Sequence, residues 1–344
     1  LQTMCKKAYI YPANDTENDF FKSMHYALEY NGVSVTNRLL DFFSTDIYIL
    51  NWYETVYRHQ FLLFLKKRAF LLLLRLTRKN CIVYLHNVRP HRKYVAIPDY
   101  RLSERLLRYL IRYSTALVCL SETSVRYFPA SVQKELVNAR RKIHCIPHPN
   151  FTHITPLPKA ISPDKLRLLS FGGIELYKGV EIAVEAMNDI RTPQIELWIV
   201  GAAQKTIQNR LQELSTNPNT HFDFRYIEEK YLPELFAYFD LCVYPLDMDS
   251  CLNSSSVLLA FSMQTSVICP QIATLDTYPQ GDYIAYSYAT PSDHIQALSA
   301  AIQKAYALKK NNPDIFTLMG ENCYSETLKQ NNQDLINNKI KEIL

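Results

Sequence analysis

The chain has 344 residues, enough for two domains of ordinary size, and 48% of them are apolar, enough to fill two hydrophobic cores. Charged residues make up 21%, which argues against wholesale disorder. The net charge of +5 is unevenly spread. Residues 1–150 hold 23 Lys and Arg against 11 Asp and Glu, whereas residues 151–344 hold 15 against 22. We therefore expect the first half to meet an anionic partner: a membrane surface, a lipid diphosphate or nucleic acid.

The cysteine pattern indicates a reducing compartment. Eight cysteines are scattered along the chain without a CxxC pair or a Cys/His cluster at metal-ligand spacing, and most of them sit in apolar runs that suit buried thiols. No signal peptide is visible, and the longest strictly apolar run of the first half, Ala69–Leu74, is far shorter than the roughly 20 residues of a membrane span. A cytoplasmic protein is expected, with no metal site.

Strands and helices alternate along the first half, which predicts parallel βαβ units in residues 1–150. The predicted strands are Ala8–Tyr11, Asp46–Leu50, Cys81–Leu85, Ala116–Leu120 and Ile143–Ile146. The predicted helices are Glu17–Asn31, Tyr57–Arg78 and Leu102–Tyr113. Residues 151–165 contain three prolines and no clear period, and are predicted to be an interdomain linker.

The alternation restarts after the linker and predicts a second doubly wound domain over residues 166–320, followed by a helical tail at 321–344. The predicted strands are Leu166–Phe171, Ile195–Val200, Phe222–Tyr226, Leu241–Tyr244 and Val267–Cys269. The predicted helices are Gly179–Ile190, Gln204–Ser215, Leu232–Phe239, Ser254–Met263 and Asp293–Leu308. In such sheets, ligands bind at the carboxyl ends of the strands.

Two segments of the second half have the character of anion sites. In LLSFGGIELYKG a strand runs into Gly172 and Gly173, and Lys178 precedes a new helix. Backbone amides, an ammonium group and a helix N-terminus together would cradle a diphosphate, although an ordinary strand-to-helix turn is the alternative. The second segment has Asn253 as a helix cap before Ser254, Ser255 and Ser256. It offers amides and hydroxyls at a helix start, or is simply a well-capped helix.

The order of these segments resembles the donor-binding half of the group 1 glycosyltransferases, known as family 4. The resemblance rests on FGGIELYKGVEIAVEAM, IELWIVGAA and FDLCVYPLDMDSCLNSSSVLLAFSMQTSVI in the second half. LNWYE at 50–54, VYLHNVRPH at 83–91 and IPHPN at 146–150 resemble a bacterial polysaccharide branch of that family. The resemblance implies a GT-B fold, an α/β architecture of two Rossmann-like doubly wound domains with a cleft between them.

The same resemblance implies transfer of a sugar, with retention, from a nucleotide diphosphate sugar and without a metal ion or other cofactor. Lys178 and the serine-led helix start would hold the donor phosphates, and Tyr226 and Ile227 would lie along the nucleotide base. Five positions depart from the family pattern: Glu175 replaces an Arg, Leu252 and Ala260 replace a pair of Glu, and Ser255 and Gln264 each replace a Gly. Two alternatives therefore stay open, a catalytically weak GT-B subunit that binds or scaffolds and a GT-B-fold sugar-nucleotide epimerase.

Further candidates follow strands of the first half. His86, Asn87 and His91 come after the strand Cys81–Leu85, and His86 would hold the sugar or the acceptor, or accept a proton, unless it bonds only local backbone. His148 would reach the cleft or brace the hinge. Glu54 is a candidate acceptor base, with a solvated loop acid as the alternative.

The basic residues of the first half gather on two predicted helices. Tyr57–Arg78 is rich in Leu and Phe with interspersed basic residues, and is either an interfacial helix or a core helix with a cationic face. Arg101, Arg105, Arg108 and Arg112 form one stripe on the next helix. We expect a lipid-linked glycan acceptor, peripheral contact with the inner face of the cytoplasmic membrane and no nucleic acid. Such an enzyme would serve a bacterial surface polysaccharide such as capsule, O-antigen or lipopolysaccharide.

Overall fold

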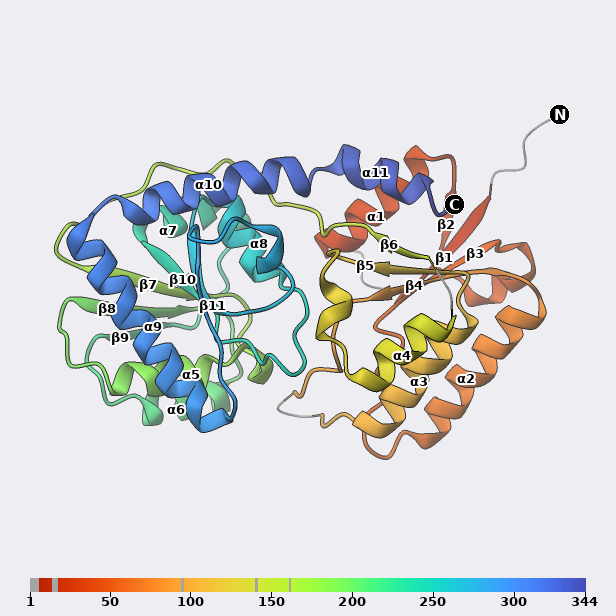
Figure 1. The fold of residues 1–344 in the computed structure, drawn as a ribbon, viewed down its shortest axis with the longest axis horizontal. Coiled ribbons are helices and arrows are strands. Elements are labelled where there is room, and N and C mark those ends of the chain that lie inside the picture. Colours follow the sequence, from red (N-terminus) through yellow and green to blue (C-terminus); the bar gives the residue numbers. More distant parts are fainter. Residues whose placement is uncertain (1–5, 14–17, 94–95, 140–141, 161) are drawn as a thin grey trace. The chain divides into compact units, whose positions relative to one another are not determined.

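The computed structural model describes residues 6–13, 18–93, 96–139, 142–160 and 162–344 (Figure 1). The chain divides into two compact units. The first unit comprises Leu1–Pro149, Asp249–Asn253 and Gln330–Leu344, and the second comprises Asn150–Met248 and Ser254–Lys329. Each unit is built on its own parallel sheet.

The sheet of the first unit has the strand order β2-β1-β3-β4-β5-β6, and every pair is parallel. Its strands are β1 (Lys7–Tyr11), β2 (Ser34–Thr36), β3 (Ile47–Asn51), β4 (Asn80–Leu85), β5 (Ala116–Cys119) and β6 (Ile143–Cys145). Its α-helices are α1 (Asp19–Tyr30), α2 (Phe61–Leu76), α3 (Tyr100–Tyr113), α4 (Ala130–Ala139) and α11 (Gln333–Lys341), and its short 3₁₀ helices are η1 (Leu39–Ser44) and η2 (Ser124–Tyr127). In Figure 1, α2, α3 and α4 cover one face of the sheet, and α1 and α11 cover the other.

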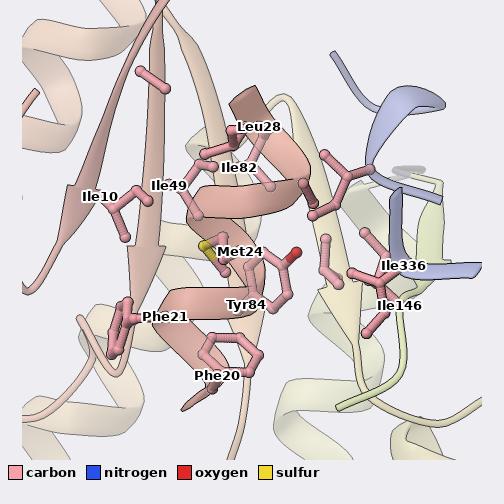
Figure 2. Close-up of a cluster of buried hydrophobic side chains, with 14 of the residues drawn as sticks. Ile10, Phe20, Phe21, Met24, Leu28, Ile49, Ile82, Tyr84, Ile146 and Ile336 are labelled. Carbon is pink, nitrogen blue, oxygen red and sulfur yellow. The ribbon is translucent and has the colours of Figure 1, made fainter. Parts of the chain in front are cut away.

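The core beneath α1 shows why the first unit folds this way. Buried residues of α1, including Phe20, Met24 and Leu28, recur at helical spacing, and the side chain of Asn18 caps the helix by accepting from the amide of Phe20. These side chains pack against the sheet, as Figure 2 shows around Tyr84. The other members of this cluster that Figure 2 labels are Ile10, Phe21, Ile49, Ile82, Ile146 and Ile336.

The last helix of the chain completes this core. Ile336 of α11 is buried in the same cluster, and the side-chain amide of Asn31 donates to the carbonyl of Asn337 at 3.0 Å. Ser23 also bonds Gln333 at 2.6 Å. The carboxyl-terminal segment is therefore part of the first unit, although it follows the second in sequence.

The sheet of the second unit has the order β12-β11-β10-β7-β8-β9 and is also parallel. Its strands are β7 (Leu166–Phe171), β8 (Ile195–Val200), β9 (Thr220–Asp223), β10 (Leu241–Val243), β11 (Ser266–Pro270) and β12 (Ile284–Tyr286). Its α-helices are α5 (Val180–Asn188), α6 (Lys205–Leu214), α7 (Leu232–Tyr238), α8 (Ser255–Ser262), α9 (Pro291–Asn311) and α10 (Ile315–Gln330), with 3₁₀ helices η3 (Leu176–Lys178), η4 (Glu229–Tyr231) and η5 (Leu275–Thr277). In Figure 1, α5 and α6 lie on one side of this sheet, and α7 and α8 lie on the other.

The predicted fold class, two Rossmann-like α/β halves, is confirmed. The sequence analysis missed β2, β12 and α4 because two of them are three-residue edge strands and α4 buries only Val132 and Leu136. The predicted strand Phe222–Tyr226 was wrong in its bounds. The strand begins at Thr220 and ends at Asp223, whose carboxylate accepts from the amide and the guanidinium of Arg225 and so turns the chain.

The segment predicted as a linker packs within the second unit. The ammonium group of Lys159 donates to the carbonyls of Phe236 and Phe239, and the amide of Phe151 donates to the hydroxyl of Ser262. The predicted tail of residues 321–344 is divided between the units, since α10 belongs to the second and α11 to the first.

Two further observations concern compartment and membrane. The cysteines in the part of the chain that the structure describes are free thiols, and all of them except the half-buried Cys145 are buried. None of the helices formed by the described residues is both long enough and apolar enough to cross a bilayer.

The role of α11 gives a first prediction. Replacement Ile336→Ala removes a side chain that is only 3% exposed and should lower the free energy of unfolding of the first unit by about 2–5 kcal/mol. Urea denaturation followed by circular dichroism measures it. The control Lys341→Ala, at an exposed position of the same helix, should change stability by no more than about 0.5 kcal/mol. Equal stability of the two variants would show that α11 does not contribute to the core.

Candidate functional site

The glycine-rich turn after β7 brings a cation and backbone amides together. Lys178, at the end of η3, places its Nζ 3.1 Å from the position that a Cβ on Gly172 would take. Gly173 is exposed and Lys178 half-exposed, so an anion at this turn has access to both. A side chain at Gly201, after β8, would overlap the carbonyl oxygen of Gly172, so the two chain segments meet backbone to backbone.

A second close contact joins this turn to the loop after β10. Gly179 has a φ of +66°, and a side chain there would overlap the carbonyl oxygen of Pro245. The amide of Asp247 donates to the carbonyl of Tyr177 at 3.3 Å. The lysine loop and the loop that leads to α8 are therefore held against each other.

The start of α8 is a capped helix N-terminus. The hydroxyl of Ser254 accepts from the amide of Val257, and the amide of Ser254 donates to the hydroxyl of Thr274 at 3.1 Å. Ser255 is exposed, and Ser256 is half-exposed. The side-chain amide nitrogen of Asn253 is buried and has no hydrogen-bond partner among the described residues, which leaves one donor unused just before the helix.

These two candidate anion-binding elements lie at one edge of the sheet. β10 pairs in parallel with β7, so the loops that follow them leave the sheet at the same carboxyl edge. Tyr226 and Ile227 follow β9, which is the edge strand two positions beyond β7. Tyr226 is 78% exposed and thus open to contact. The structure brings Gly172 and Lys178 together. The helix α8, which begins with serines, follows β10, the strand that pairs with β7.

In the first unit, His86 follows β4 and is buried against aromatic rings. It stacks on Trp52 at 4.1 Å, and its Nε2 bonds the Oδ1 of Asn51 at 2.9 Å. Because the Nδ2 of Asn51 donates to the carbonyl of Tyr11, the Oδ1 faces His86 as an acceptor, so Nε2 carries the proton. Burial, with a smaller contribution from His148, lowers the pKa of His86 to about 3. His86 is therefore neutral at physiological pH and a weak proton acceptor, which argues against a role as a general base.

The other candidates of this unit are tied to structure. Asn87 is buried and forms an antiparallel bridge with Cys251. His91 bonds the hydroxyl of Ser250 at 3.0 Å through Nδ1. The Nδ1 of His148 bonds the carbonyl of Pro149, and its own carbonyl accepts from Asn331 in the carboxyl-terminal segment. These contacts favour the bracing role for His148.

Glu54 is a buried acid, which contradicts the alternative of a solvated loop residue. It is 5% exposed and lines a cavity of about 130 Å³ beside Arg89, Tyr100 and Glu104. Burial raises the pKa of Glu54 to about 7, although the cationic Lys67 opposes that shift. A carboxyl group with this pKa exchanges protons near neutral pH, as a general base must.

Sequence reasoning missed three residues that shape these sites. Lys67, read as part of a basic face, is buried and donates to the carbonyls of Tyr53 and Thr55. Trp52 has a positive φ of 49° and supplies the ring that stacks on His86. Gly201 was recognised only as part of the motif IELWIVGAA. Gly201 could have been singled out, because glycine is scarce in this chain and this one directly follows a predicted strand. The burial of Lys67 has no sequence signature.

Comparison with known proteins finds a family model that matches most of the second half of the chain. The family model described as glycosyl transferases group 1 matches residues 157–317. A GDP-mannose:glycolipid 4-beta-D-mannosyltransferase of Xanthomonas campestris pv. campestris is 29% identical over 234 residues, which cover 65% of this chain and 61% of the relative. A second protein of that name is 33% identical over 106 residues, 30% of either chain. This chain thus aligns with less than two thirds of either relative's length.

Solved structures share the fold. Sucrose-phosphate synthase from Thermosynechococcus elongatus superposes with a TM-score of 0.73 at 15% identity, covering 98% of this chain and 97% of that one. The Anabaena protein HepE in complex with UDP and glucose gives a TM-score of 0.63 at 13% identity, covering 98% of each chain. The resemblance to the group 1 glycosyltransferases and the GT-B class of fold are confirmed, and the family matched is one of transferases, as predicted.

Burial of Glu54 predicts a pH dependence of stability. Its pKa is raised on folding from 4.5 to about 7, so the unfolded chain releases this proton first as pH rises. As pH rises from 4.5 to about 7, the free energy of unfolding should fall by up to about 3 kcal/mol, relative to that of the variant Glu54→Gln. Denaturation series from pH 4.5 to 8 measure the difference between the two proteins. A control, Glu122→Gln at an exposed position, should follow the wild type at every pH. Parallel curves for wild type and Glu54→Gln would contradict the burial of this acid.

Proposed function

We propose that this protein is a glycosyltransferase that moves a sugar from a nucleotide diphosphate sugar to a lipid-linked glycan in the synthesis of a bacterial surface polysaccharide. The names of the two Xanthomonas relatives support GDP-mannose as the donor and a glycolipid as the acceptor. The HepE structures hold UDP or UDP-glucose, so UDP-sugars are tested beside GDP-sugars. The enzyme would act at the inner face of the cytoplasmic membrane, where its acceptor is anchored.

The observation that carries the proposal is the pairing of two anion-binding elements at one sheet edge. The Gly172–Lys178 turn and the start of α8 follow the paired strands β7 and β10, within the part of the chain that matches the family model. A diphosphate has two charged groups, and these elements offer an ammonium group, amides and hydroxyls for both.

The chemistry follows from where charge develops during transfer. Breaking the bond between the sugar and the diphosphate puts negative charge on the leaving phosphate, which Lys178 and the positive end of α8 would stabilise. The positive charge of these groups would balance the charge of the leaving phosphate, so the proposal requires no metal ion. The first unit would hold the acceptor, with His86, Asn87 and His91 as candidate contacts, His148 as a brace and the acceptor hydroxyl oriented for attack.

The stereochemical outcome is the finer part of the proposal. The family resemblance favours retention. The β-linkage in the relatives' names would instead require inversion, because mannose is α-linked in GDP-mannose. Inversion needs a base to take the acceptor proton, and Glu54 is the candidate, because it is buried beside a cavity and its pKa is about 7. NMR of the product distinguishes the two: an α-linkage supports retention, and a β-linkage with loss of turnover in Glu54→Gln supports inversion.

A binding or scaffold subunit is the second candidate. Leu252 and Ala260 stand where the family has its paired Glu, and both are fully buried apolar residues. Neither position supplies a carboxylate to the donor. The epimerase is the third candidate, and it would need no acceptor.

The decisive experiment incubates the protein with GDP-, UDP- and dTDP-sugars, with and without a lipid-linked acceptor. We expect free nucleoside diphosphate from one donor, and only when acceptor is present. An isomerised sugar without acceptor would identify an epimerase. A nucleotide that binds but is never turned over would identify the scaffold.

Lys178 gives a sharper test of the donor site. Replacement Lys178→Ala removes a charge-assisted contact to the diphosphate and should weaken binding of the nucleoside diphosphate at least about tenfold. Calorimetric titration measures this affinity. The variant Lys205→Ala removes an exposed lysine at the start of α6 and should bind like the wild type. Unchanged affinity in Lys178→Ala would remove this lysine from the site.

A further inference from the structure

Helix α2 has two apolar faces, and only one of them is buried. Phe64, Leu71 and Leu74 pack inward. At about 100° per residue, the opposite arc of the helix, about 120° wide, consists of apolar residues alone. The exposed members are Phe61, Leu62, Leu65, Ala69, Leu72, Leu73 and Leu76, and Leu62 and Leu76 are 73% and 72% exposed. In Figure 1, α2 is the outermost of the three helices on its face of the sheet, so no neighbouring helix of that layer covers this arc.

A second segment extends the same apolar surface. In η1, Leu40 is 95% exposed and Phe43 is 90% exposed. The ring of Phe42 packs on Phe70 of α2, and the ammonium group of Lys79 donates to the carbonyl of Phe43 at 3.0 Å. The two segments are thus fixed side by side, and a contiguous exposed apolar surface of this kind marks an interaction site.

A groove between α2 and α3 borders this surface, and arginine side chains line it. It encloses about 440 Å³ between Phe61, Phe64 and Leu65 on one side and the stripe of α3 on the other. Arg68 lies over the ring of Tyr109 at 4.6 Å, and Arg112 pairs with Glu135 of α4. The remaining lining residues are Arg105 and Arg108, and none of the described residues that line this groove is acidic. An adjoining cavity of about 380 Å³ adds Arg101, together with Asp99, whose carboxylate caps the start of α3.

We propose that η1 and the exposed faces of α2 and α3 form a docking surface for an anionic lipid bilayer. The leucines and phenylalanines would enter the boundary between headgroups and acyl chains, and the arginine groove would take lipid phosphate groups. Basic residues flank the apolar arc, with Arg68 and Arg75 on one side and Lys66 on the other, the arrangement of a helix that lies in the plane of an interface.

The charge of the surface argues against its other occupants. A second copy of this chain packed on the same face would bring Arg105 and Arg108 of both copies together, and none of the described residues that line the groove is an acid that would separate them. A nucleic acid would satisfy the arginines and leave the exposed leucines in water. An anionic bilayer satisfies both halves of the surface, since its acyl chains take the apolar side chains and its phosphates take the arginines.

The inference deepens the proposed function, because a lipid-linked acceptor resides in such a bilayer, and vesicle binding tests it without any transfer reaction. The protein is sedimented with vesicles of phosphatidylcholine, with and without phosphatidylglycerol. We expect binding to the anionic vesicles only. Replacing Arg105 and Arg108 together by Gln should lower the partition coefficient about fivefold for each arginine. The triple change Leu62→Gln, Leu72→Gln and Leu76→Gln should lower it at least about tenfold.

Matched controls separate the surface from general charge and hydrophobicity. Lys205→Gln with Lys304→Gln removes two exposed charges from the second unit, and Val137→Gln removes a side chain that is 76% exposed on α4. Both controls should bind like the wild type. All variants should keep the wild-type melting temperature, since the replaced side chains are exposed or lie at the groove, and Leu62→Trp should shift its fluorescence to the blue on anionic vesicles.

Several results would overturn the docking surface. Absence of wild-type binding, equal binding to both kinds of vesicle, or unchanged binding of the triple variant would each do so. A wild-type dimer that the triple variant abolishes, without vesicle binding, would assign the face to a second copy. Retention of a short RNA in place of vesicles would assign it to nucleic acid. Failure of the transferase assay alone, with vesicle binding intact, would count against the proposed function and leave this surface in place.

Discussion

The backbone contact of Gly179 with the carbonyl of Pro245 is the constraint on which the candidate donor site depends. It fixes the lysine loop after β7 against the loop after β10, and no side chain fits between them. The bond from Asp247 to the carbonyl of Tyr177 holds the same two loops. The glycine-lysine turn and a helix N-terminus that are separated by more than 70 residues in sequence are thereby brought to one sheet edge. The scarcity of glycine in this chain makes its use at 172, 173, 179 and 201 informative.

The first unit is organised around buried ionisable groups. Burial depresses the pKa of His86 and raises that of Glu54. His86 is therefore neutral at pH 7, whereas Glu54 titrates near that pH. Lys67, whose pKa burial lowers to about 8, is held by two carbonyls near the same acid. Shifted pKa values of this kind are typical of functional sites, and in the proposed function Glu54, which titrates near neutral pH, would be the group that transfers a proton.

The uneven charge of the chain has a local structural basis. The excess of basic residues in the first half is concentrated on α2 and α3, where Arg68, Arg105 and Arg108 line one groove. The leucines beside them are exposed, although the same helix buries its other face in the core. A helix with two apolar faces is unusual for a surface position, and the basic residues beside it indicate which kind of surface would cover it.

The sequence by itself determined the two parallel α/β halves, most strand positions and the glycine, lysine and serine segments, because hydrophobic periodicity and turn chemistry are local properties. It predicted the strands Leu166–Phe171 and Ile195–Val200 residue for residue, since both are short, mainly apolar runs bounded by turns, interrupted only by Arg167 and Ser170 in the first and by Glu196 in the second. Short edge strands such as Ser34–Thr36 left no such pattern. Only the tertiary structure decided that Glu54 and Lys67 are buried, that α11 belongs to the first core and that one face of α2 is uncovered. These properties depend on which elements pack together over long sequence separations, and no local pattern encodes them.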